Sequence, residues 1–78
     1  HVDRLIIDME HVPLIDMTGL VAMKSMLSGI AREGRLVYLC GKWDITNRIM
    51  HKIADHPVHH RVRIAGSVRE AVDMITSE

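Results

Sequence analysis

The chain has 78 residues, carries 10 Lys and Arg against 10 Asp and Glu, and is 47% hydrophobic with no Phe. That apolar share is too high for a disordered tail and predicts one small domain, which at this size buries only about 60% of its unfolded surface. The single cysteine excludes an intramolecular disulfide, the neutral charge argues against nucleic acid as a partner, and no apolar run is long enough to span a bilayer.

Three short β-rich runs are predicted to be strands, at residues 4–9, 36–40 and 62–64. The apolar centre of the first run predicts a strand that is buried on both faces and has a neighbouring strand on each side. The alternation of the third run predicts an edge strand with one solvated face.

Three helical patterns alternate with these strands. The first is predicted to begin at Thr18 as N-cap and to end near residues 32–34. Its apolar stripe recurs at spacings of three and four: Leu20, Met23, Leu27 and Ile30. The second is predicted over residues 43–55, before Pro57. The third opens with a capping box, in which Ser67 and Glu70 satisfy backbone amides reciprocally.

The alternation of strands and helices predicts one α/β domain with parallel strands. In such a sheet, ligands usually bind where the carboxyl ends of the strands meet the amino ends of the helices. That edge is predicted to comprise residues 9–18, 41–44 and 66–67. In its first loop we expect Val12, Leu14 and Ile15 to pack beneath the sheet edge, and Gly19 to leave room for backbone or ligand.

The strand at residues 5–8 and the following HVPLIDMTGL sequence of residues 11–20 resemble the signature loop of STAS domains. This family includes the cytoplasmic C-terminal domains of SulP anion transporters and the bacterial anti-sigma factor antagonists. Residues 34–41 resemble the family's next strand, and residues 67–71 resemble the start of its final helix. The resemblance covers essentially the whole chain and implies the STAS fold, a small and mostly parallel sheet packed with helices.

STAS domains begin with a β-hairpin and a helix ahead of the strand that starts here at Arg4. The resemblance therefore implies that residues 1–78 are the C-terminal two-thirds of a STAS domain, without the N-terminal hairpin and first helix. An upstream segment would then supply the second neighbour that we expect for the first strand.

In the antagonists, a Ser immediately before the motif Gly is phosphorylated and switches off partner binding. Thr18 occupies that place here, and Met17 stands where a second Ser often precedes it. The resemblance thus implies a phosphoacceptor-like switch at Asp16, Thr18 and Gly19. In the alternative interpretation, Thr18 is only a helix cap and Asp16 only orders the loop.

The loop sequence resembles bacterial SulP transporters more than antagonists. This implies a regulatory domain on the cytoplasmic face of the bacterial inner membrane, in a secondary transporter of sulfate- or bicarbonate-type anions. The transporter's own transmembrane domain would be its partner, and the domain could form homo-oligomers. The alternative is a stand-alone anti-sigma factor antagonist-like phospho-switch. No catalytic constellation and no cofactor motif is present, so we expect neither enzymatic activity nor a cofactor.

Basic residues concentrate between residues 42 and 63, a segment that contains five Lys and Arg but only two Asp. A solvated helix face would explain them. A sharper interpretation is a basic docking surface of Lys42, Arg48 and Lys52 for anionic lipid headgroups or an acidic partner, such as acyl carrier protein.

Other reactive or unusual side chains receive structural interpretations. The histidines at positions 51, 56, 59 and 60 match no zinc pattern, so solvated loop histidines are predicted and no metal site. Met17, Met23 and Met26 are predicted to fill the core rather than to form a contact surface. Cys40 is predicted to be a small buried hydrophobe. Trp43 either anchors a partner or covers the core.

Overall fold

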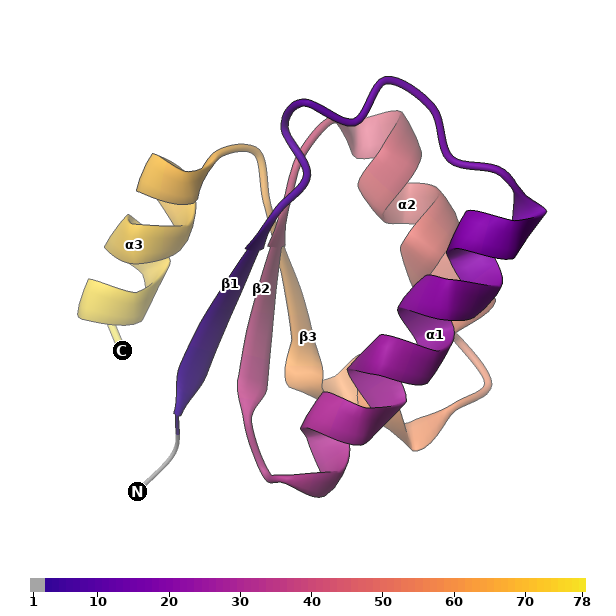
Figure 1. The fold of residues 1–78 in the computed structure, drawn as a ribbon. Helices are drawn as coiled ribbons and strands as arrows, with labels where there is room; N and C mark the ends of the chain where they lie inside the picture. Colours follow the sequence, from indigo (N-terminus) through magenta and orange to yellow (C-terminus); the bar gives the residue numbers. More distant parts are fainter. Residues whose placement is uncertain (1–2) are drawn as a thin grey trace.

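The structure, a computed structural model, describes residues 3–78 and alternates strands with helices (Figure 1). The strands are β1 (Arg4–Asp8), β2 (Leu36–Cys40) and β3 (Val62–Ala65). The α-helices are α1 (Met17–Arg32), α2 (Trp43–Lys52) and α3 (Val68–Thr76), and a short 3-10 helix η1 (Pro57–Arg61) precedes β3. The predicted α/β alternation is therefore confirmed. No helix within the described residues is long and apolar enough to cross a bilayer.

The sheet is wholly parallel, and its strands lie in the order β1-β2-β3. The second strand covers the predicted residues 36–40, and β3 is the edge strand that the sequence predicted. Residues 3–78 place only β2 beside β1, so the second neighbour that we expect from an upstream segment stays a prediction. The central position belongs to β2, and Leu5, Ile6 and Ile7 of β1 are half-buried instead.

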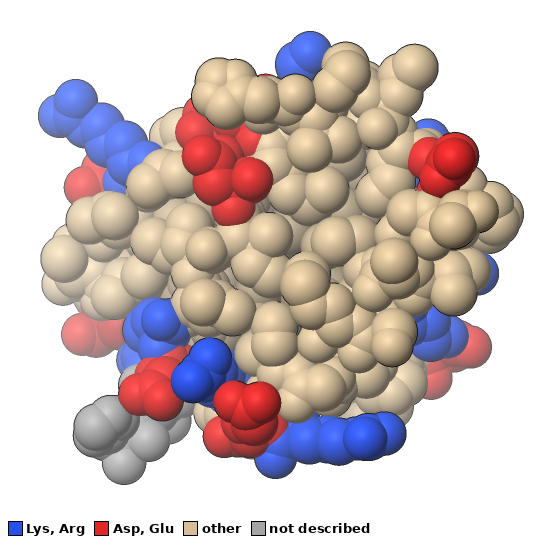
Figure 2. Space-filling view, in the orientation of Figure 1, with Lys and Arg blue, Asp and Glu red and all other residues tan. Residues whose placement is uncertain are grey.

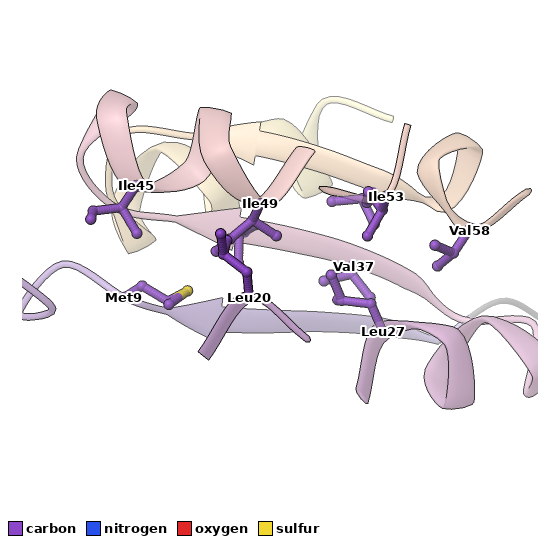
Figure 3. Close-up of a cluster of buried hydrophobic side chains, with 10 residues drawn as sticks. Met9, Leu20, Leu27, Val37, Ile45, Ile49, Ile53 and Val58 are labelled. Atoms are coloured by element: carbon purple, nitrogen blue, oxygen red, sulfur yellow. The ribbon is translucent and has the colours of Figure 1, made fainter. Parts of the chain in front are cut away.

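Helices cover both faces of the sheet, and the pleat of β2 divides its side chains between them. Val37 and Leu39 point to the face covered by α1 and α2, where they join the larger apolar cluster. Figure 3 shows this cluster, with side chains of α1 and α2 meeting over the sheet. Its buried members include Leu27, Ile49 and Ile53, each with no exposed surface.

The opposite face carries a smaller cluster under α3, formed by Tyr38, Cys40, Ala65 and Ala71. Cys40 is fully buried, as predicted, and burial raises the pKa of its thiol. A polar clasp closes this side. The Tyr38 hydroxyl donates to the Glu78 carboxylate, and Arg4 Nε donates to the same carboxylate at 2.6 Å. This face is therefore held by fewer apolar side chains and by one ionic contact.

The loops that follow the three strands lie at one edge of the sheet, as predicted (Figure 1). Gly41 at the end of β2 has φ +153, and a Cβ there would lie 3.1 Å from the Met9 carbonyl oxygen. A glycine is required at this point because the backbone after β1 approaches so closely.

The end of α2 and one contact in the predicted capping box of α3 differ from the sequence predictions. The α2 helix ends at Lys52 rather than at residue 55, and a turn leads from it to His56. The His56 ring then caps η1, since Nδ1 accepts from the Val58 N–H at 3.0 Å. The cap of α3 is confirmed, because Ser67 Oγ accepts from the Glu70 N–H at 3.1 Å. The Glu70 carboxylate, however, accepts from the Gly66 N–H instead of from Ser67.

Candidate functional site

The loop between β1 and α1 ends in a side-chain cap made by Asp16. Its Oδ1 accepts from the Gly19 N–H at 2.8 Å, and its backbone carbonyl accepts from the Leu20 N–H. The prediction that Thr18 is the N-cap is therefore wrong: Thr18 is the second residue of α1, and it is exposed. Asp16 orders the loop–helix junction and leaves the Thr18 hydroxyl without a capping role.

Gly19 faces the side chain of Ile15 rather than open space. A Cβ on Gly19 would lie 2.9 Å from Ile15 Cγ1, a distance that requires the neighbour to shift. The prediction that Gly19 leaves room for a ligand is therefore wrong, because Ile15 fills that room. Asp16, Thr18 and Gly19 do share one helical turn, but Gly19 serves the packing of the loop.

The apolar residues of this loop divide between the core and the solvent. Val12 and Ile15 pack against the larger apolar cluster, as predicted. Leu14 was predicted to join them, but its side chain is 81% exposed. Leu14 therefore adds an exposed apolar side chain to this loop.

Two of the three predicted basic docking residues contact this loop–helix junction. Arg48 donates to the Ile15 carbonyl at 2.6 Å, and Lys52 Nζ lies 3.9 Å from Met17 Sδ. Arg48 and Lys52 also line a hollow of about 320 Å³ together with Leu20 and His51. Lys42 is exposed at the start of α2 and does not line this hollow. The sequence reasoning missed His51 as a neighbour of Arg48 and Lys52, although it lies within one helical turn of both.

The outer face of α1 is exposed and carries no charged residue before Arg32, which is exposed in the last turn. We define this face by its exposed residues Met17, Thr18, Val21, Ala22, Ser25, Met26 and Gly29. Figure 2 shows the result as a wide area without Lys, Arg, Asp or Glu over α1 and β1, with the charged side chains at its rim. A solvated helix face is normally polar or charged, so this face has the character of a contact surface.

Two methionines contribute to this surface, contrary to the prediction that all three near α1 fill the core. Met17 is 62% exposed and Met26 is 43% exposed, while Met23 packs against the larger cluster as predicted. The spacing of the methionines could have predicted this difference, because only Met23 falls on the apolar stripe with Leu20 and Leu27. Trp43 is 67% exposed, which leaves its ring available to a partner rather than over the core.

Two histidines between α2 and β3, His56 and His59, contact backbone groups. His56 and His59 are half-buried instead of solvated, and His59 Nδ1 lies 2.7 Å from the His56 carbonyl oxygen. His60 is exposed. In the part of the chain that the structure describes, no three His, Cys, Asp or Glu side chains could hold a metal ion together.

Comparison with protein families gives one match: the family model described as STAS domain matches residues 1–71. The match runs from β1 through the loop–helix junction, α1 and α2 to the start of α3. Comparisons with curated proteins and with solved structures give no match.

Proposed function

The chain belongs to the STAS domain family, whose role is regulatory, and from that premise we propose that it regulates a SulP-type transporter of sulfate- or bicarbonate-type anions. In this proposal the domain lies on the cytoplasmic face of the bacterial inner membrane. It acts without catalysis, by contact with the transporter's transmembrane domain. The loop sequence of residues 11–20 is what favours a transporter over other STAS proteins.

The observation that carries the proposal is the uncharged outer face of α1. Charged residues are depleted in the centres of protein interfaces, and methionine is enriched there. Met17, Val21 and Met26 are 62%, 52% and 43% exposed, and because Met17 and Met26 lie at opposite margins of this face, a partner surface that buries all three would cover its full width. Exposed Leu14 extends the same apolar area beyond the start of α1.

The hollow beside α2 supplies a second, basic contact next to this face. Arg48, His51 and Lys52 line it around Leu20, an arrangement suited to an acidic helix that also offers an apolar side chain. We therefore propose acyl carrier protein or another acidic cytosolic protein as a further partner. Loss of binding in Lys52→Gln with binding kept in Lys42→Gln would support this hollow as its docking site. Equal binding by both variants would contradict it.

Reconstitution of the intact gene product in proteoliposomes tests the transporter function. We expect time-dependent uptake of labelled sulfate or bicarbonate, and a several-fold change in that uptake when residues 1–78 are deleted. The deleted protein must still insert into the liposomes, which protease protection checks. Absence of uptake in the intact protein would overturn the proposal, and so would unchanged uptake after the deletion.

A phospho-switch is the second candidate, and the position of Thr18 favours it. The Thr18 side chain is exposed at the N-terminal end of the uncharged outer face of α1. A phosphate there would add nearly two negative charges to that surface and would repel a partner that binds it. At the start of α1 the phosphate would gain from the positive end of the helix dipole, but the nearby Asp16 carboxylate would repel it.

Incubation of the chain with an anti-sigma kinase and ATP, followed by intact-mass spectrometry, tests the switch. One added phosphate is expected, and it should be lost in Thr18→Ala but kept in Thr76→Ala, which removes another exposed threonine. Either no added phosphate or a phosphate that survives Thr18→Ala would contradict the switch.

A further inference from the structure

A groove between α1 and η1 gathers cationic side chains on the flank of the C-terminal half of α1. Figure 1 shows the segment before β3 lying beside this half of the helix, and α1 contacts η1 there. The groove consists of two adjoining hollows of about 390 Å³ and about 230 Å³, which share Ser28, Arg32 and His56 as lining residues.

Positive charge dominates the lining of this groove. Lys24 and Arg32 border the larger hollow, and Arg32 and Arg61 border the smaller one. Among residues 3–78, no Asp or Glu side chain lines either hollow. Asp55 lies at the rim of the larger hollow, and its Oδ1 is 3.4 Å from Lys24 Nζ. The Lys24 ammonium lowers the pKa of the Asp55 carboxyl. Lys24 is thus partly neutralised, and the two guanidinium groups remain.

The guanidinium groups of Arg32 and Arg61 make few contacts with the described residues. Arg32 makes no hydrogen bond or ion pair with any described residue, and Arg61 reaches the Gly34 carbonyl only at 3.5 Å. The last carbonyl groups of α1 do not need them, because those of Ile30 and Ala31 accept from the backbone N–H groups of Glu33 and Gly34. Both arginines therefore have donors available to a ligand.

The His56 ring presents a donor, not an acceptor, to the same groove. Because Nδ1 accepts from the Val58 N–H at 3.0 Å, the ring proton resides on Nε2 in the neutral form. Nε2 lies 3.4 Å from Ser28 Oγ, whose own hydroxyl donates to the Lys24 carbonyl at 2.7 Å. The groove is therefore lined by N–H donors at Arg32, Arg61 and His56.

We propose that this groove binds a small oxyanion of the phosphate or sulfate type, held chiefly by Arg32 and Arg61. A guanidinium fork matches two oxygens of such an anion with two parallel N–H donors, which a point charge cannot do. The hollows have ample volume for one tetrahedral anion. This site adjoins the outer face of α1, because Val21, Ser25 and Gly29 also line the larger hollow, but it does not depend on the proposed transporter or switch function.

Titration of the isotope-labelled chain with inorganic phosphate and with sulfate, at constant ionic strength, tests the site by backbone amide chemical shifts. Saturable shifts are expected at Ser28, Gly29 and His56. Loss of one bidentate charged contact should weaken the affinity about tenfold or more, so Arg32→Gln and Arg61→Gln should each show that loss. Arg69→Gln, on the exposed side of α3, is the matched control and should keep the wild-type affinity.

The proposal is overturned if the shifts do not saturate, or if Arg32→Gln and Arg69→Gln bind equally well. Sedimentation with vesicles of phosphatidylcholine, with and without phosphatidic acid, then separates two sources of the anion. Capture by the anionic vesicles that Arg32→Gln abolishes identifies a lipid headgroup. Saturable binding of free phosphate or sulfate without vesicle capture identifies a soluble anion.

Discussion

The two sides of α1 are both apolar, but only one of them is buried. The inner side places Leu20 and Leu27 in the larger cluster over the sheet, at 6% and 0% exposure. The outer side leaves Met17 and Met26 at 62% and 43% exposure, without a charged residue between them on that face. The inner side stabilises the fold, while the outer side has no such role within the chain. The contact with a partner surface that we propose would account for this difference.

The largest expected effect falls on the inner side. Leu27→Ala should lower the free energy of unfolding by about 2–5 kcal/mol, because it removes a fully buried side chain and leaves a cavity. Urea denaturation measures the change. Met26→Ala, one residue away on the outer side, should change stability by only about 0.5 kcal/mol or less. Similar losses for the two variants would contradict the contrast between the two sides.

Alanine substitutions at two glycines of α1, one next to the packed loop and one on the outer side, should change stability in opposite directions. Gly19→Ala should destabilise the domain by about 1–3 kcal/mol, because the new methyl group would lie 2.9 Å from Ile15. Gly29→Ala meets no atom within 4 Å and should stabilise it by about 0.5–1 kcal/mol through higher helix propensity. Thermal unfolding of the two variants checks the signs. A gain in stability for Gly19→Ala would show that Ile15 does not occupy that space.

The cap at the start of α1 should contribute less. Asp16→Ala should cost about 1 kcal/mol, since the Gly19 N–H loses its side-chain acceptor. Asp16→Asn keeps the acceptor and should recover most of that loss. Thr18→Ala should be nearly neutral, because Thr18 does not cap the helix in this structure. Chemical denaturation that ranks Thr18→Ala below Asp16→Ala in stability would restore Thr18 as the cap.

The smallest effect concerns the polar clasp on the α3 side. Hydrogen bonds from Tyr38 and then Arg4 lower the pKa of the Glu78 carboxyl. A lowered pKa in the folded state means that the contribution to stability is present above the ordinary pKa of glutamate, and is lost as the pH falls through the folded-state value. Between about pH 6 and about pH 3, the unfolding midpoint should therefore fall more in wild type than in Glu78→Gln. Asp73→Asn, a neighbouring acid on α3, should follow wild type. Equal acid sensitivity of Glu78→Gln and wild type would exclude the clasp.

Local patterns predicted much of the fold, because they reflect nearby backbone geometry. The continuous apolar run of residues 36–40 predicted β2 with its observed bounds, and the Ser67 cap of α3 was also identified. The half-burial of β1 was not predictable in this way. An apolar run indicates burial but does not say whether helices or neighbouring strands bury it.

The loop–helix junction was identified correctly as a place, but its details depend on contacts distant in sequence. Asp16 and Thr18 are both good caps and lie two residues apart, so local preference could not choose between them. The burial of Ile15 and the Arg48 hydrogen bond to its carbonyl, from 33 residues away, accompany the start of α1 at Met17. The exposure of Met17 and Met26 was readable from their spacing, since neither falls on the buried stripe.

The most direct test of the outer face of α1 as a regulatory contact is anion uptake by the intact protein carrying Met26→Lys, compared with Val72→Lys. The two side chains are 43% and 44% exposed, so both substitutions place a charge on an equally accessible apolar position and should leave stability alike. We expect Met26→Lys to change anion uptake several-fold relative to wild type, and Val72→Lys on α3 to leave it at the wild-type level. Equal uptake by both variants would contradict it.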